Sequence, residues 1–232
     1  MPLPQIIAID GPAASGKSTL GKKLADELDY LFFDTGVMYR AVTWAALNTG
    51  INIDDEAAIT TLAENIEIDI RPPSNPDGRN CDILVNRQDV SWEIRSPEVD
   101  RDVSQVSAYP GVRRALTNQQ RRIGLRGRVV MVGRDIGTVV MPDAELKVYL
   151  DASAEQRASR RFREQRERGA GKSYEEIFSA MCERDQYDST RAHAPLRPAS
   201  DAIILDTDQS DAEQVLKNVL GLIHRMAAEN PL

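Results

Sequence analysis

Gly11-Pro12-Ala13-Ala14-Ser15-Gly16-Lys17-Ser18 is the stretch that decides the fold, because it matches the phosphate-binding pattern G-x-x-x-x-G-K-[ST]. The isoleucine-rich run over residues 5–10 precedes it and predicts a buried parallel strand. Leucines at every fourth position from residue 20 to residue 28 predict a helix with one apolar face. A strand, a glycine loop and a helix in this order are the context that a P-loop requires. The sequence therefore predicts a nucleoside triphosphate site.

The chemistry of this loop follows from its residue types. Gly11 and Gly16 allow a tight turn, and the main-chain N–H groups and the helix dipole attract a phosphate. Lys17 is expected to reach the β- and γ-phosphates, and the hydroxyl of Ser18 is expected to bind Mg²⁺. The residues predicted to bind the nucleotide are Gly11, Pro12, Ala13, Ala14, Ser15, Gly16, Lys17, Ser18 and Thr19.

The composition is that of a soluble globular protein. The chain has 232 residues, of which 41% are hydrophobic and 28% charged, and this length fits one large α/β domain with a small inserted subdomain. A net charge of −7 argues against binding to a nucleic-acid polymer or an anionic membrane. Cys81 and Cys182 lie far apart, form no CxxC metal site and suit a reducing compartment. With no signal-peptide pattern and no membrane-length apolar run, we expect a cytoplasmic protein. We also expect a monomer.

Short apolar runs alternate with helical patterns along most of the chain. Five of these runs predict buried strands, at residues 5–10, 31–33, 129–132, 147–150 and 202–206. Strands that alternate with helices predict an α/β fold, in which helices flank a parallel, doubly wound sheet. Ser173 and Glu176 stand at the spacing of a capping box that begins a further helix, and residues 188–198 predict a loop. We expect residues 1–232 to form a single domain.

The middle of the chain has a different pattern. Residues 66–71 alternate apolar and polar side chains, and residues 72–80 are rich in proline, glycine and asparagine. Residues 81–86 and the short run around Val90 and Trp92 predict further strands. We interpret this antiparallel segment, from about residue 66 to residue 96, as an inserted subdomain.

Arginines gather where a second anionic ligand would bind. Arg40 follows the strand end Asp34-Thr35-Gly36, and Arg134-Asp135 stands at another strand end. The helix expected after Asp151 carries Arg157, Arg160, Arg161, Arg163, Arg166 and Arg168. Guanidinium groups bind phosphates in a bidentate manner, so such a helix could close as a lid. The alternative is a solvated face paired with neighbouring glutamates; we favour the lid for Arg157, Arg160 and Arg161, and the solvated face for Arg166 and Arg168.

Taken together, these motifs resemble bacterial cytidylate kinase, a P-loop nucleoside monophosphate kinase. The resemblance covers nearly the whole chain and rests on the P-loop, Asp34-Thr35-Gly36 with Tyr39-Arg40, residues 133–140, Glu183-Arg184-Asp185, residues 188–191 and Ala194-Pro195-Leu196. It implies transfer of the γ-phosphate from ATP to CMP or dCMP with Mg²⁺, an acceptor-binding region at residues 36–110 and a lid at residues 153–171.

The resemblance also implies a role for individual residues. The residues implied to hold the CMP phosphate are Thr35, Arg40, Arg134 and Arg191. The ribose would lie against Arg184 and Asp188, and the base would be read by Ser104, Arg113 and Asp135, with Tyr39 packed beside the nucleotide. The implied catalytic side chains are Lys17, Arg134, Arg157, Arg160 and Arg161.

The chemistry of cytosine agrees with these assignments. Its N4 amino group calls for a carboxylate such as Asp135, and its O2 and N3 atoms call for a donor such as Arg113. Uracil presents O4 instead of the amine, so a carboxylate would disfavour UMP. Alternatives stay open: Asp135 could orient Arg134, and Ser104 could be an ordinary helical serine. Ser18 stands where some relatives have glycine, so its part in holding Mg²⁺ could be auxiliary.

The mechanism needs no general base, because the second pKa of a phosphate monoester lies near ~6 and the attacking oxygen is already anionic. We assign no catalytic role to His193 or His224, the only histidines. One rival function is another kinase of this fold, acting on AMP, UMP or shikimate. The other is a nucleotide-dependent switch, which the absence of an Asn-Lys-x-Asp guanine-reading pattern and the presence of the arginines disfavour.

Overall fold

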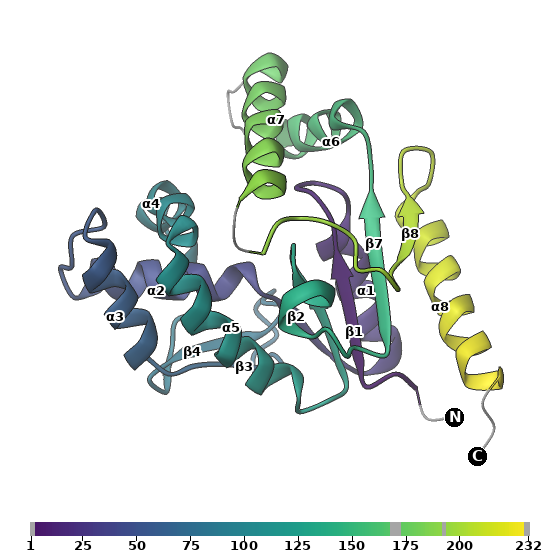
Figure 1. The fold of residues 1–232 in the computed structure, drawn as a ribbon, viewed down its shortest axis with the longest axis horizontal. Helices are drawn as coiled ribbons and strands as arrows, with labels where there is room; N and C mark the ends of the chain where they lie inside the picture. The colour runs from purple at the N-terminus through teal and green to yellow at the C-terminus, as the bar shows by residue number, and fades with distance from the viewer. Residues whose placement is uncertain (1–2, 168–172, 192–193, 230–232) are drawn as a thin grey trace.

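Five parallel strands form the central sheet, in the order β2-β6-β1-β7-β8 (Figure 1). The computed structural model describes residues 3–167, 173–191 and 194–229, with side chains to residue 226. The strands of this sheet are β1 (Ile6–Asp10), β2 (Leu31–Asp34), β6 (Val129–Val132), β7 (Leu146–Asp151) and β8 (Ile203–Asp206). These are the five strands that the apolar runs predict, so the predicted α/β fold is confirmed.

Helices occupy both faces of the sheet and its carboxyl edge. They are α1 (Lys17–Leu28), α2 (Gly36–Asn48), α3 (Glu56–Asn65), α4 (Pro97–Ala108), α5 (Pro110–Gly124), α6 (Ala154–Glu167), α7 (Tyr174–Thr190) and α8 (Ala212–Glu229). Two short helical segments are the 3-10 turn η1 (Glu93–Arg95) and the π-helix η2 (Ile136–Val140). No described helix is long and apolar enough to cross a membrane.

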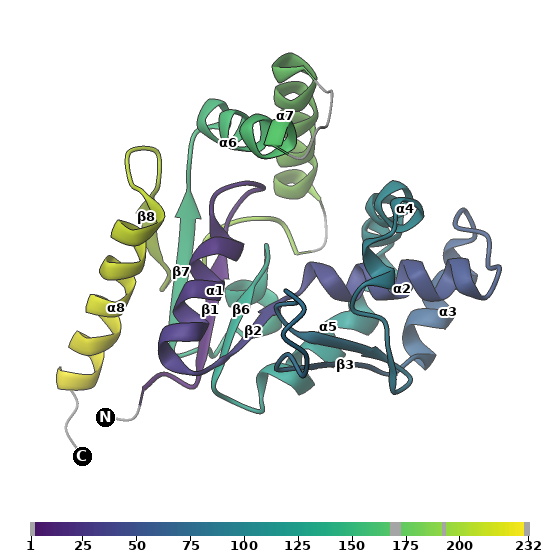
Figure 2. The same ribbon diagram turned by 180° about the vertical axis from the view of Figure 1, so that it is seen from behind.

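Strand β1 is buried on both faces because its side chains alternate between two cores. Ile7 and Ile9 pack with α1 and α8, whereas Ile6 and Ala8 pack with α2, α5 and η2. Figure 2 shows the arrangement from the side of α1. This double coverage explains why the strand is an unbroken apolar run.

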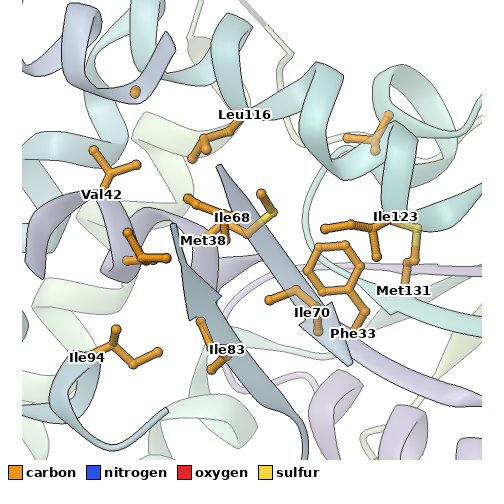
Figure 3. Packing of buried hydrophobic residues seen from close by; sticks show 14 of the residues in the cluster. Phe33, Met38, Val42, Ile68, Ile70, Ile83, Ile94, Leu116, Ile123 and Met131 are labelled. Atoms are coloured by element: carbon orange, nitrogen blue, oxygen red, sulfur yellow. The ribbon is translucent and has the colours of Figure 1, made fainter. Parts of the chain in front are cut away.

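The inserted segment forms a three-stranded antiparallel sheet, β3 (Ile68–Arg71), β4 (Asp82–Val85) and β5 (Gln88–Asp89). Its apolar side chains, among them Ile68, Ile70 and Ile83, pack in the same core as Phe33 of β2 and Met38 of α2 (Figure 3). One continuous core therefore joins the two sheets.

The last strand of this sheet begins earlier than the sequence predicts. Asn86 and Arg87 both have positive φ, 49° and 71°, and make a two-residue hairpin turn between Val85 and Gln88. The turn starts β5 at Gln88, so the prediction of a strand around Val90 and Trp92 is wrong. Trp92 instead follows β5, with its indole N–H donating to Asp77 Oδ2 at 2.9 Å.

The exposed edge of β3 pairs with side chains of α5 in place of another strand. Gln119 Oε1 accepts from the Ile68 N–H at 2.9 Å, and Arg122 Nη2 donates to Ile68 O at 2.8 Å. Arg126, just beyond α5, donates to Ile70 O at 3.1 Å. Free strand edges invite association with other chains, and here those backbone groups are satisfied within the chain.

Helices α6 and α7 lie beyond the carboxyl end of β7 (Figure 1). The predicted capping box is confirmed: the Ser173 hydroxyl accepts from the Glu176 N–H, and the Glu176 carboxylate accepts from the Ser173 N–H. Helix α7 continues to Thr190, so Asp188 lies in its last turn and not in the predicted loop. The helix continues because no proline or glycine interrupts it. The predicted lid residues 168–171, with Arg168, and His193 lie outside the described residues.

We predict that Gly21→Ala destabilises the fold by about 1–3 kcal/mol, although alanine favours helices. A Cβ at this position would lie 2.6 Å from Val132 Cγ1 and 3.0 Å from Phe32 Cε2, so α1 would be pushed off the sheet. Urea denaturation measures the effect. Gly221→Ala in α8 is the matched control, since its Cβ would meet nothing nearer than 3.8 Å, and it should be neutral or stabilising. Equal effects of the two substitutions would contradict this packing argument.

Candidate active site

The P-loop connects β1 to α1 at the carboxyl edge of the parallel sheet. Gly11 has a φ of 147°, and a Cβ there would lie 2.2 Å from Leu150 O, so only glycine fits. Gly16 is the N-cap of α1, with a φ of 97°. The amino end of α1 therefore opens onto the loop, which is the geometry that binds a phosphate.

Lys17 is buried inside this loop. Its Nζ donates to Pro12 O at 2.5 Å and to Ser15 Oγ at 3.4 Å. Burial, together with the positive charge of Arg134, lowers the pKa of Lys17 to about 7. An anion placed in the loop would offset both effects and restore the charged form of this lysine.

Ser18 and Asp34 form a pair of oxygen ligands beside the loop. Ser18 Oγ donates to Asp34 Oδ2 at 3.1 Å, and Asp34 Oδ1 accepts from the Gly36 N–H at 2.9 Å. Mg²⁺ prefers oxygen ligands and is commonly held by one or two carboxylates together with substrate phosphates. This donor set therefore fits Mg²⁺. Among the described residues no group of three or more His, Cys, Asp or Glu side chains could hold a metal alone.

Asp10 is a site residue that the sequence analysis missed. Its two carboxylate oxygens accept from the Ile136 N–H at 2.8 Å and from the Gly137 N–H at 2.7 Å. Burial raises the pKa of Asp10 to about 6, against the opposing effect of these two hydrogen bonds. The signal available in the sequence was an acidic residue at the end of a buried apolar run, directly before the glycine loop.

Helices α5 and α7 and the residues that follow β6 contribute a cluster of arginines and aspartates, which lies across from the P-loop. Arg113 Nη2 donates to Asp135 Oδ2 at 3.1 Å, and Arg191 Nη2 lies 3.9 Å from Asp135 Oδ1. The Arg113 guanidinium lies 5.5 Å from the ring centre of Tyr39. The structure thus brings together four residues that the sequence analysis assigned to the acceptor nucleotide.

Asp188 organises the other half of this cluster. Its carboxylate accepts from Arg134 Nε at 2.5 Å and from Arg191 Nη1 at 3.4 Å, and it lies 3.9 Å from Arg184 Nε. Among the described residues, the ion pairs of this cluster join the guanidinium groups of Arg113, Arg134, Arg184 and Arg191 to two carboxylates, those of Asp135 and Asp188. This excess of positive charge suits an anionic ligand.

Two donors in the cluster are buried without a hydrogen-bond acceptor among the described residues. They are Arg113 Nε and Arg191 Nη2. Burial, followed by the nearby charge of Arg113, lowers the pKa of Arg191. Buried donors without partners are costly, and such groups are typical of a site that a polar ligand completes.

The other predicted acceptor residues have contacts of their own outside this cluster. The hydroxyl of Thr35 donates to Val132 O at 3.1 Å. Arg40 donates to Ile94 O at 3.1 Å and pairs with Asp100 at 2.6 Å. Ser104 is exposed on α4, and no contact of its side chain within the described part of the chain joins it to the cluster. The structure therefore does not bring Ser104 together with Arg113 and Asp135.

The three arginines expected in the lid have different surroundings. Arg157 is buried and donates to Ala152 O at 2.9 Å, to Ala13 O at 3.2 Å and to Asp185 Oδ2 at 2.5 Å. Arg160 binds the hydroxyl and carbonyl oxygens of Thr207. Arg161 is exposed and pairs with Glu164. Arg157 thus ties α6 to the P-loop and to α7.

A cavity of about 410 Å³ lies beside the P-loop. Ser15, Gly16 and Thr19 line it on one side, and Arg160 and Thr207 line it on the other. The remaining wall comes from α6 and from the start of α8. The residues contributed by the start of α8 carry no recognisable motif, so they could not be predicted from the sequence.

Comparison with known proteins identifies the family. The sequence model of the cytidylate kinase family matches residues 7–225. The chain is 56% identical to a cytidylate kinase of Chloroflexus aggregans, over 93% of this chain and 92% of that protein. It is 49% identical to a cytidylate kinase of Herpetosiphon aurantiacus, over 96% of each chain.

A solved structure of shikimate kinase from Bacteroides thetaiotaomicron has a similar fold. It superposes with a TM-score of 0.50 at 15% identity, covering 94% of this chain and 98% of that one. Similarity at this level concerns the fold alone, so it supports the P-loop kinase architecture and not the substrate. The family match and the close relatives together lead to one conclusion: the chain belongs to the cytidylate kinase family.

Proposed function

We propose that this chain transfers the γ-phosphate of ATP to CMP and dCMP, with the P-loop as the donor site and the arginine–aspartate cluster as the acceptor site. The observation that carries the acceptor assignment is a pair of buried donors, Arg113 Nε and Arg191 Nη2, that have no hydrogen-bond acceptor among the described residues, on guanidinium groups that both pair with the Asp135 carboxylate. Donors and an acceptor side by side are what the cytosine edge requires.

The donor nucleotide would lie between the P-loop and the cavity. Its phosphates would bind the loop amides and Lys17, and its adenine would enter the cavity bounded by Arg160, Thr207 and the start of α8. Ser18 and Asp34 would hold Mg²⁺ together with the phosphates of ATP. When bound, the metal ion supplies positive charge that neutralises the phosphates.

The acceptor would bind with its phosphate toward the P-loop. Thr35, Arg40, Arg134 and Arg191 are proposed for the phosphate, Arg184 and Asp188 for the ribose, and Asp135 and Arg113 for the base, beside Tyr39. Ser104 stays a prediction for the base; its exposed position means that α4 would have to approach the cluster. The proposed acceptor-binding region, residues 36–110, would make this approach by moving together with α5, to which its antiparallel sheet is hydrogen-bonded.

Catalysis would come from position and charge. The acceptor phosphate is anionic at neutral pH, since its second pKa lies near ~6, and so it needs no general base. Lys17, Arg134 and the arginines of α6 would neutralise the transferring group while the site excludes water. We assign Arg157 to holding α6 against the P-loop, because its guanidinium already binds Ala13 O and Asp185.

The remaining proposals concern organisation. We propose that residues 153–171 act as the lid and that the protein is a cytoplasmic monomer. The charge of −7 supports small-molecule substrates over polyanions, and the two separate thiols, Cys81 buried and Cys182 exposed, suit a reducing compartment. Gel filtration with light scattering tests the oligomeric state.

The substrate assignment predicts that CMP and dCMP are the best acceptors in a coupled assay of ADP release, run against UMP, AMP and shikimate. Rapid hydrolysis of ATP without any acceptor, or a higher kcat/KM with one of the other three compounds, would refute the assignment.

Asp135→Ala should lower the ratio of kcat/KM for CMP to that for UMP by about 10- to 100-fold, because the acceptor for the N4 amine is lost. Asp135→Asn keeps the shape and offers an N–H to O4 of uracil, so it should favour UMP further. An unchanged ratio in both variants would remove Asp135 from base recognition and leave it the role of orienting arginines.

The lowered pKa of Lys17 predicts proton uptake when ATP binds. With a pKa of about 7, most of this lysine is neutral at pH 8, and the phosphates of ATP raise its pKa and recharge it. Calorimetry at pH 8 in buffers of different ionisation enthalpy should therefore detect close to one proton taken up. Lys17→Arg cannot lose its proton and should show no uptake, and equal uptake by both proteins would contradict the prediction.

Lys17→Ala should keep the fold but lose nearly all turnover.

A further inference from the structure

The π-helix η2 follows directly after Arg134 and Asp135, and Asp135 is its N-cap. A π-helix is a rare, wide turn that occurs mostly as a single turn and often near functional sites. Gly133 precedes Arg134, and its surroundings leave no space for a side chain. A Cβ there would lie 2.7 Å from Ile136 Cδ1 and 2.8 Å from Thr35 Oγ1. The orientation of Arg134 and Asp135 therefore depends on what holds this turn.

The amino end of η2 is held by Asp10. The carboxylate accepts the N–H groups of Ile136 and Gly137, at 2.8 and 2.7 Å, and only 5% of the residue is exposed. Asp10 also immediately precedes Gly11, the first residue of the P-loop. One side chain thus fixes the start of η2 to the strand that carries the donor site.

The carboxyl end of η2 is held by Arg121 of α5. Its Nε donates to Val140 O at 2.9 Å, and its Nη2 donates to Val139 O at 2.6 Å. A carboxylate at the amino end and a guanidinium at the carboxyl end both complement the dipole of a helical turn. Two charged side chains from different elements therefore bracket the turn.

We propose that Asp10 and Arg121 are positioning residues for the acceptor nucleotide. By fixing both ends of η2 they hold Arg134 and Asp135 in the orientation that receives the acceptor, although Arg121 contacts neither substrate site. This inference rests on the acceptor roles proposed above for Arg134 and Asp135. A small displacement of such groups is enough to change binding and turnover.

Arg121→Met tests the proposal most directly, since Arg121 is exposed and its loss should be tolerated by the fold. We expect KM for CMP to rise about 10-fold, and the preference for CMP over UMP to fall, with KM for ATP unchanged. The matched control is Arg122→Met, on the same helix, whose guanidinium binds Ile68 O and Glu67 instead of η2. This control should lose similar thermal stability but keep both KM values and the CMP preference.

Arg121→Lys retains the charge and one donor, so it should restore part of the CMP affinity. Asp10→Asn replaces one accepting oxygen by an N–H donor against a backbone N–H, and it should raise KM for CMP more than KM for ATP. Acceptor kinetics that are unchanged in Arg121→Met, or equally changed in Arg122→Met, would overturn the proposal. Asp135→Ala assayed in parallel separates the two hypotheses: if it erodes the CMP preference while Arg121→Met does not, only the positioning role fails.

Discussion

The parallel pairing of β1 with β6 on one side and β7 on the other is the constraint on which the structure depends. The register places Ile9 beside Val132 and Asp10 beside Tyr149, so that the strands end at one edge of the sheet. The P-loop, the Arg134-Asp135 segment and the connection to α6 all leave from this edge. Ligands of open α/β sheets bind there, and here the edge carries both the P-loop and the segment that contributes Arg134 and Asp135 to the arginine–aspartate cluster.

Much of this architecture could be predicted from the sequence, because it is encoded locally. The P-loop has a fixed spacing, the five buried strands are continuous apolar runs, and the Ser173 capping box is a four-residue signal. The strand β5 was misplaced because Asn86 is typical of a two-residue hairpin turn but Arg87, which also has a positive φ, stands where such a turn usually has glycine. The extension of α7 past Asp188 was not predicted either, because a helix end without glycine or proline has only a weak sequence signal.

The candidate site could be predicted only in part. Its arginines and Asp135 were identified by motif, and four of the assigned residues do meet in one cluster. The sequence could not show which charged groups pair with each other. It suggested that Arg157 was free to act in a lid, whereas in the structure its guanidinium donates hydrogen bonds to three different residues. Asp10 and Arg121 were missed because both bind backbone groups, which carry no sequence signal. The partners of Asp10 are more than a hundred residues away, and those of Arg121 lie on a different element.

Helix α5 is a rigid element that makes three separate sets of contacts along its length. Near its amino end Arg113 binds Asp135 in the arginine–aspartate cluster. Further along, Gln119 and Arg122 complete the edge of the inserted sheet, and Arg121 holds η2. A rigid rod transmits rotation and translation along its whole length. A displacement of the inserted sheet would therefore move the Arg113 guanidinium as well, so the positions of the sheet and of this side chain are mechanically coupled through α5.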